Sequence, residues 1–245
     1  MIVTQIKRAL VIAKKDLAVY YARGPVLVFG LLMPAFLFLA FSIRRDISLT
    51  FLFPGLLSMA LFFSVSSIGP IIAPWETRMK TYERLVSAPI TIWAIILGDV
   101  IASMLYGLLI TLVIITVGVL FLGLNLLSLE LLAGTILAAL SFASLGVLLS
   151  FPPTDNPSNI NMLATMIKFP LLFISGVFIP LSEMGNAKVL AYFSPLSYYT
   201  DLVSHAVGGG GYFTIPTDLA MLLLFGIVIL VLTIKLHSWS ITKRF

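Results

Sequence analysis

Apolar residues gather into six long runs along this chain, and most of the charged residues lie in the short stretches between them. The first two runs contain no charged residue at all. A run of about 18 or more apolar residues can cross a bilayer as a helix, because the helix satisfies its own backbone polar groups. The pattern predicts an all-α membrane protein with six transmembrane helices. The runs are residues 25–43, 47–75, 92–122, 131–151, 160–179 and 219–234.

Composition supports a membrane protein, because 60% of the residues are hydrophobic and 10% are charged. Soluble domains have about 25% charged residues. Six spans within 245 residues leave only short loops, so we expect residues 1–245 to form a single transmembrane domain without a soluble catalytic domain. The chain has no Cys, which excludes disulfides, thiolate metal sites and cysteine nucleophiles. We expect no metal site, no catalytic residue and no cleavable signal peptide.

The distribution of Lys and Arg predicts the orientation in the membrane. With six spans both termini lie on one side, and that side receives eleven cations, against three on the other side and one inside a span. The positive-inside rule then places both termini in the cytoplasm, and we expect a multi-pass protein of the plasma membrane. The eleven are Lys7, Arg8, Lys14, Lys15, Arg23, Arg78, Lys80, Arg84, Lys235, Lys243 and Arg244; the three are Arg44, Arg45 and Lys188.

The N-terminal segment, residues 1–24, predicts an amphipathic helix in the cytoplasmic interface. Its apolar residues repeat every three or four positions and share one face, while its Lys and Arg residues gather elsewhere. Cations beside an anionic leaflet gain about 1 kcal/mol each, so membrane lipid is an expected partner. A solvated leader is the alternative. The apolar face consists of Val3, Ile6, Leu10, Ala13, Leu17 and Tyr20.

A second charged segment, residues 74–89, lies between the second and third runs and reads PWETRMKTYERLVSAP. Its apolar residues are spaced four, three and four, which predicts one short cytoplasmic helix with an apolar stripe and a charged face. Sixteen residues exceed the usual connection length, so docking against a partner protein is favoured over a simple connector. The candidate docking residues are Trp75, Glu76, Arg78, Met79, Tyr82, Glu83 and Arg84.

The connection between the fifth and sixth runs, residues 181–216, predicts short apolar helices that re-enter the outer leaflet or cap a cavity. Leu196, Tyr199 and Val203 follow helical spacing, and four glycines follow at residues 208–211. The glycines cannot form a phosphate loop, because the chain contains no G-x-x-x-x-G-K-[ST] motif.

Three stretches resemble the permease subunits of type 2 ABC exporters, the group that includes drug, lipid and polysaccharide export permeases. They are AKKDLAVYYARGPVLVFGLLMPAFLFLAF, ETRMKTYERLVSAPITIWAIILGDVI and FPLLFISGVFIPLSEMGNAKVLAYFSPLSYYTDLV. The third is the most specific, because S-G-x-x-x-P is followed by P-L-x-Y. Lys80 stands where the family commonly has Gly, and His205 stands where an Arg is frequent.

The resemblance implies a dimer of this chain with a second copy or a homologous permease, and a separate ATPase chain that binds ATP and Mg²⁺. This chain itself would bind no cofactor and hydrolyse no ATP. Residues 74–89 would dock into the ATPase, and residues 181–216 would form an outer gate that includes Tyr198 and Tyr199. Substrate would pass along Phe62, Ser66, Phe173 and Ser175, a lining that suits a lipophilic or amphipathic compound.

Two ionisable residues, Asp99 and Lys168, lie inside predicted spans at similar depths from the cytoplasm. Intramembrane charges usually pair or mark a transport path, so one hypothesis is that these two tie the third and fifth spans together. The alternative is that both reach the interface, since a long Lys side chain can snorkel.

Other functions fit the sequence less well. An ion-coupled secondary transporter or channel needs midplane ligands, and only Asp99 and Lys168 qualify. An intramembrane protease needs a Ser–His or Asp–Asp pair at membrane depth, which the chain does not offer. A structural scaffold leaves residues 181–216 unexplained. The net charge of +5 is spread over loops rather than one basic face, so we expect no nucleic-acid binding.

Overall fold

The computed structural model describes residues 2–21, 32, 36, 40 and 49–241. These residues form helices and no strands, which confirms the all-α prediction for this part of the chain. The elements are α1 (Ile2–Asp16), the π-helical turn η1 (Leu17–Tyr21), α4 (Leu49–Ser66), α5 (Gly69–Arg78), α6 (Thr81–Ser87), α7 (Ile92–Leu122), α8 (Leu129–Leu148), α9 (Pro157–Phe173), the 3-10 turns η3 (Leu181–Glu183) and η4 (Gly185–Ala187), α10 (Lys188–Ala191), α11 (Pro195–Ala206) and α12 (Ile215–Ile241).

Four segments in the described part of the chain are long and apolar enough to cross a membrane. They are Leu52–Arg78, which joins α4 and α5, and the helices α7, α8 and α12. The predicted fifth span is represented by α9, which has 17 residues and ends at Phe173. The predicted first span, residues 25–43, falls almost wholly outside the described residues. The count of six therefore stays a prediction.

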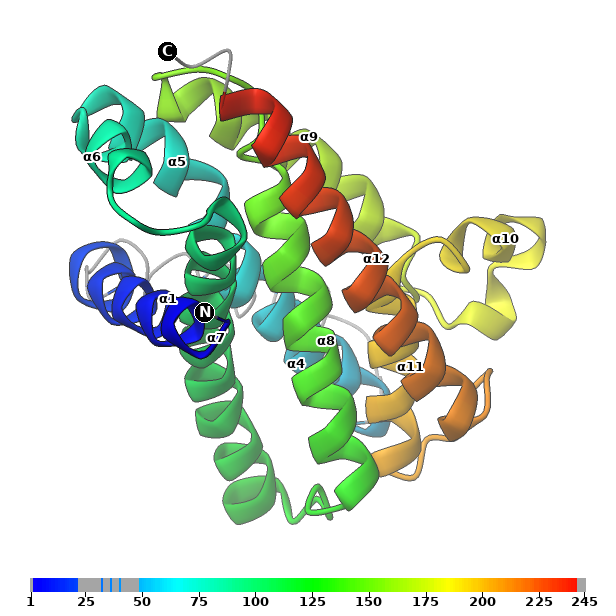
Figure 1. Ribbon diagram of the computed structural model, residues 1–245. Helices are drawn as coiled ribbons and strands as arrows, with labels where there is room; N and C mark the ends of the chain where they lie inside the picture. Colours follow the sequence, from blue (N-terminus) through cyan, green and yellow to red (C-terminus); the bar gives the residue numbers. More distant parts are fainter. Residues whose placement is uncertain (1, 22–31, 33–35, 37–39, 41–48, 242–245) are drawn as a thin grey trace.

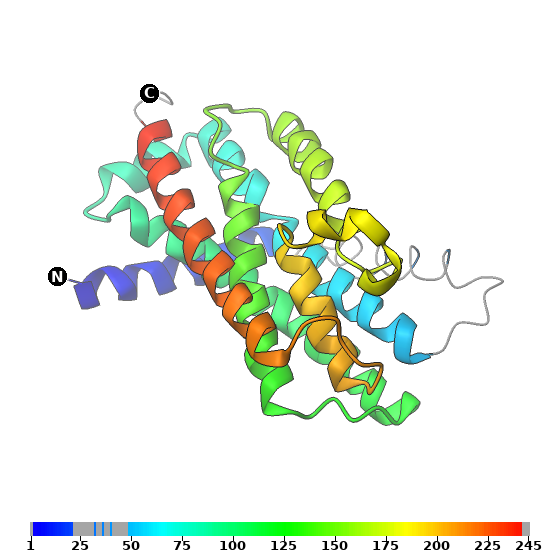
Figure 2. The same cartoon turned by 90° about the vertical axis from the view of Figure 1, so that its right-hand side faces the viewer.

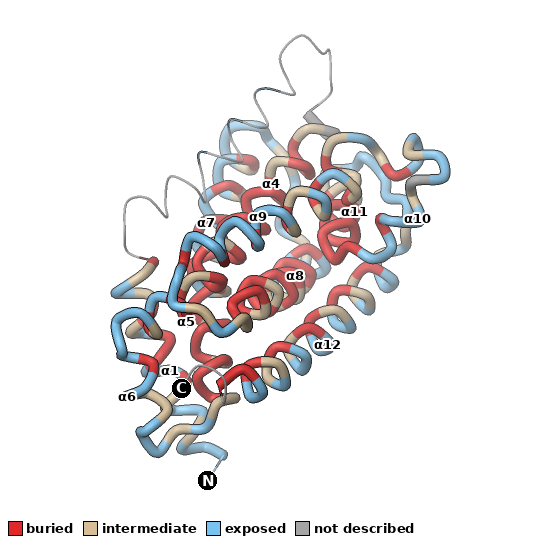
Figure 3. The backbone as a smooth tube through the Cα atoms, turned by 90° about the horizontal axis from the view of Figure 1, so that it is seen from above, coloured by how far each residue is buried: buried red, intermediate tan, exposed pale blue. Residues whose placement is uncertain are grey.

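Helix α8 lies at the centre of the bundle, with buried residues on most of its surface (Figure 3). It packs closely against α12, and polar side chains join the two helices (Figure 1). Ser141 donates to the carbonyl of Leu222 at 2.8 Å, and Thr233 donates to that of Ser144 at 3.1 Å. Such hydroxyl contacts hold helices together where lipid removes the hydrophobic driving force.

Helix α1 lies across α7 rather than along it (Figures 1 and 2). The crossing is close because Gly98 of α7 has no side chain, and a Cβ there would lie 2.8 Å from the carbonyl oxygen of Ala9. Farther along, the backbone N–H of Thr91 donates to Gln5 Oε1 at 3.1 Å, which anchors α1 to the start of α7. Ala9, Ile12, Ala13 and Asp16 are the buried residues of α1.

The second predicted span is broken between α4 and α5. Pro70 has no backbone N–H, so it cannot make the helical hydrogen bond to the carbonyl of Ser66, four residues earlier. The ammonium group of Lys168, from α9, donates to this Ser66 carbonyl instead. A cation that caps freed carbonyls at a helix end is favourable. Lys168 therefore supplies a buried hydrogen-bond donor at the break between α4 and α5.

Helix α11 packs against α4, α8 and α12, so the predicted outer helix forms part of the bundle (Figure 2). Nearly every residue from Pro195 to Val203 is buried. At one end of the molecule lie α5, α6 and the end of α12, and at the other lies the connection between α7 and α8 (Figure 1). From the cation distribution we expect the α5–α6 end to face the cytoplasm, and this orientation stays a prediction.

Candidate functional site

Residues 74–89, predicted as one cytoplasmic helix, form two helices. α5 ends at Arg78 and α6 begins at Thr81, and Lys80 between them has a left-handed backbone with φ of 55°. Most L-residues avoid this conformation, because the Cβ approaches the following carbonyl oxygen. The position therefore suits a glycine, and this chain places a lysine there. The result is a sharp corner rather than a rod.

Several residues at this corner are exposed, and we call six of them the docking corner. Met79 is 68% exposed and Trp75 is 38% exposed, and the other four residues are charged. An apolar pair with a charged rim is the composition of a protein-binding surface. The docking corner consists of Trp75, Arg78, Met79, Lys80, Glu83 and Arg84.

Two of the predicted docking residues, Tyr82 and Glu76, lie inside the protein. Tyr82 is 2% exposed and belongs to a small apolar cluster with Ile12 of α1 and Ile241 of α12. Glu76 is 3% exposed and pairs with Lys15 of α1. The structure differs here from the predicted surface because residues of α1, α7 and α12 pack around Tyr82, and Lys15 reaches Glu76. Both residues position the docking corner rather than form it.

Lys15 lies in a cluster of carboxylates contributed by three helices. It forms ion pairs with Asp16, at 2.9 Å, and with Glu76, and Asp99 of α7 lies beside them. Burial alone would lower the pKa of Lys15, but the carboxylates of Asp16 and Glu76 raise it above its usual range. Burial raises the pKa of Asp16, and Lys15 partly opposes this shift. The cluster joins α1, α5 and α7 behind the docking corner.

The predicted pair of Asp99 and Lys168 does not form. Asp99 belongs to the cluster around Lys15, whereas Lys168 donates to the Ser66 carbonyl at the break between α4 and α5. Both side chains are buried, at 6% and 5% exposed, so neither reaches the interface by snorkelling in this chain. Similar depth in two spans did not imply proximity, because each residue has a nearer partner on a different helix.

The four predicted pathway residues lie in different environments. Phe62 is fully buried and packs edge-to-face on Phe142 with ring centroids 5.1 Å apart, and Ser66 is also fully buried. Phe173, at the end of α9, is 54% exposed. Ser175 lines a cavity. The structure does not bring the four together on one surface of the chain.

That cavity, which we call the outer cavity, has a volume of about 440 Å³ and lies between α4, α11 and the glycine run. Its walls are rich in hydroxyl groups, and Asp201 is its charged residue. Both oxygens of Asp201 accept backbone N–H groups beyond the glycines, from Tyr212 at 2.7 Å and Phe213 at 2.8 Å. The hydroxyl-bearing walls are Ser175, Ser182, Ser197, Thr200, Ser204 and Tyr212.

The predicted gate tyrosines are buried within the bundle. The hydroxyl of Tyr199 lies 3.1 Å from that of Thr135 on α8, and Tyr198 donates to the carbonyl of Tyr192 at 3.0 Å. Tyr198 also lines a second hollow of about 860 Å³, whose walls are aromatic. Tyr212 borders both this aromatic hollow and the outer cavity.

Sequence reasoning missed Lys15, Asp16 and Asp201. A signal existed for Asp16, which follows Ala9, Ile12 and Ala13 at helical spacing and so shares their buried face. A charge on a buried helix face needs a partner. No comparable signal marked Asp201, because its hydrogen-bond donors are backbone N–H groups on the far side of the glycine run.

A comparison with known families matches residues 3–207 to the ABC-2 type transporter. The match covers well over half of the 245 residues and confirms the resemblance seen in the sequence. No curated protein matches the chain. With its apolar helices, the chain belongs to the ABC-2 type transporter family as a transmembrane subunit.

Proposed function

We propose that this chain is the permease subunit of an ATP-driven exporter and that a separate ATPase chain docks on its docking corner. The observation that carries the proposal is the exposure of Trp75 and Met79 within a charged rim, in a chain that belongs to this family. The ATPase chain would bind ATP and Mg²⁺. The permease would work as a dimer, with a second copy or a homologous permease, in six spans across the plasma membrane.

Force from the ATPase would reach the membrane through the cluster around Lys15. The docking corner is continuous with α5, whose Glu76 pairs with Lys15 of α1. Asp99 connects the same cluster to α7. A displacement of the corner would therefore move two membrane-associated helices with it.

The substrate would be lipophilic or amphipathic. The polar outer cavity and the aromatic hollow share Tyr212, so one molecule with a polar head and an apolar body could use both. Phe173 is exposed at the end of α9 and lies on the same helical face as the exposed Met162 and Met166, which supports a path along the dimer interface.

Partner capture tests the proposal. Met79→Asp places a charge at the centre of the docking corner, and desolvating it against a partner is costly, so co-purification of the ATPase should fall at least tenfold. Leu127→Asp is the matched control, because Leu127 is 80% exposed at the opposite end of the bundle. Both variants should reach the membrane. Equal capture of the ATPase by Met79→Asp and the control would refute docking at this corner.

A further inference from the structure

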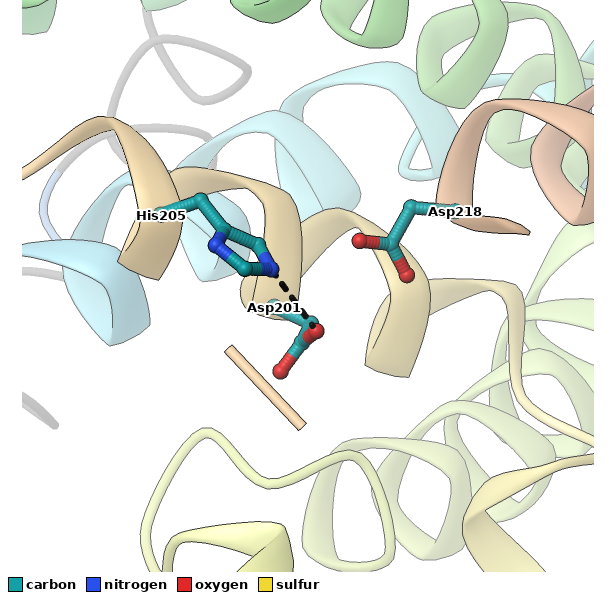
Figure 4. Close-up of side chains that lie close together, drawn as sticks. All are labelled: Asp201, His205 and Asp218. Carbon is teal, nitrogen blue, oxygen red and sulfur yellow. Dashed lines mark ion pairs between the residues drawn. The ribbon is translucent and has the colours of Figure 1, made fainter. Parts of the chain in front are cut away.

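Three ligand-type side chains converge at the outer end of the bundle, away from the docking corner. They are Asp201 and His205 of α11 and Asp218 in the first turn of α12, and their nearest ligand atoms all lie within 4.8 Å of one another (Figure 4). His205 Nε2 lies 3.8 Å from Asp201 Oδ2. The imidazole and both carboxylates point toward a common centre, although they come from two helices.

Asp218 has no partner that explains its burial. It is 0% exposed, and among the described residues neither carboxylate oxygen accepts a hydrogen bond or forms an ion pair. Its position in the first turn of α12 suits a negative charge, but it does not cap that turn. A buried carboxylate without a donor costs several kcal/mol unless a cation or a proton neutralises it.

The other two residues are held in place but keep free lone pairs. Asp201 uses one lone pair on each oxygen for Tyr212 and Phe213, and a carboxylate has about four acceptor sites. His205 Nε2 lies 2.8 Å from the carbonyl oxygen of Phe213. If this nitrogen binds a cation, the ring proton moves to Nδ1, and the carbonyl oxygen of Phe213 becomes a further oxygen ligand beside the site.

The backbone of the glycine run passes close to His205 and Asp201 at Gly211, which has no side chain. A Cβ on Gly211 would lie 2.1 Å from His205 Nε2 and 2.7 Å from Asp201 Oδ2, so a side chain at residue 211 would displace these two groups from their present positions. Gly211 and Asp201 also line the outer cavity, which provides a route for a small ion from outside.

We propose that Asp201, His205 and Asp218 bind a divalent transition-metal ion of the Zn²⁺ type, which joins α11 to α12 at the outer end of the permease. Two carboxylates and one imidazole are a ligand set that Zn²⁺ accepts at about 2.0–2.2 Å, whereas Mg²⁺ and Ca²⁺ prefer oxygen alone. The ion neutralises the two carboxylates. The proposal does not depend on ATPase docking.

Metal content of the purified full chain tests the site. The chain is prepared without a histidine tag, stripped with EDTA, equilibrated with Zn²⁺ and desalted, and bound zinc is measured by mass spectrometry. We expect about one Zn²⁺ per chain. Asp218→Asn and His205→Gln should each reduce binding at least tenfold. His237→Gln should retain it, because His237 is the other histidine and lies at the far end of α12. Equal zinc in Asp218→Asn and the unaltered chain would overturn the proposal.

A second measurement needs no variant. Diethyl pyrocarbonate modifies accessible histidine nitrogens, and His205 is only half-buried. Zn²⁺ should slow the modification of His205 at least tenfold, as followed by peptide mass spectrometry. An unchanged rate at His205 would mean that Asp218 is neutralised by a proton and that no metal site exists.

Discussion

Single residues decide the shape of the docking corner. Lys80 holds a left-handed backbone at φ 55°, and its side chain is exposed. Tyr82 and Glu76, which the sequence predicted as surface residues, are buried: Tyr82 packs with residues of α1, α7 and α12, and Glu76 pairs with Lys15 of α1. The spacing of residues 74–89 predicted one helix, whereas the structure has two with a corner at Lys80. Spacing along the chain cannot reveal which face distant helices will cover.

Lys80→Gly should stabilise the protein. The left-handed conformation costs an L-residue about 1–2 kcal/mol, and the greater freedom of unfolded glycine offsets about half of that. We expect a net gain of about 0.5–1 kcal/mol in the free energy of unfolding, measured by thermal unfolding in detergent. Lys80→Ala removes the same charge but keeps the Cβ, so it should give no gain. Equal stability of the two variants would contradict strain at this position.

Lys15→Met should destabilise the protein, because it leaves Asp16, Glu76 and Asp99 without their shared cation. Removing one partner of a buried ion pair costs about 3–5 kcal/mol, and since Lys15 is partly exposed we expect roughly 2 kcal/mol. Adding Glu76→Gln should restore much of the loss, as a double-mutant cycle of unfolding free energies would show. Lys14→Met, at the exposed neighbour, should change little. Additive losses from Lys15→Met and Glu76→Gln would rule out the pairing.

At the scale of elements, the break between α4 and α5 follows from Pro70, which the apolar pattern of residues 47–75 did not register. Hydropathy predicts how far apolar sequence extends, and it does not sense a missing backbone donor. The role of Lys168 therefore differs from the prediction. Its ammonium group donates to the Ser66 carbonyl, to which Pro70 has no backbone N–H to donate.

A double-mutant cycle between Pro70→Ala and Lys168→Met measures this role. Alone, Lys168→Met should leave the Ser66 carbonyl without its donor, and an unsatisfied buried acceptor costs about 1–3 kcal/mol. In the Pro70→Ala background the restored backbone N–H can donate to the Ser66 carbonyl. Lys168→Met should therefore lower the free energy of unfolding by about 1 kcal/mol less in that background than in the unaltered chain. Unfolding free energies provide the readout. A cycle between Asp99→Asn and Lys168→Met should instead be additive; coupling there would restore the original pairing hypothesis.

At the scale of the whole molecule, the sequence predicted an all-α membrane protein and its family, because long apolar runs and the P-L-x-Y element are local features. It did not predict the charge cluster around Lys15 or the convergence of Asp201, His205 and Asp218. Each of these joins residues from different helices, and their contact depends on how the helices cross. Crossing geometry is set by close approaches such as Gly98 against α1, which no pattern along one helix contains.

The proposed function depends on one contact, between the docking corner and an ATPase chain. Site-specific crosslinking measures this contact directly. A photo-reactive amino acid at Met79 in the assembled transporter should capture the ATPase chain in one covalent product. The same amino acid at Phe121, which is 79% exposed at the other end of α7, should not. Capture from Met79 alone is the predicted result, and capture from neither position, or from Phe121, would contradict the account.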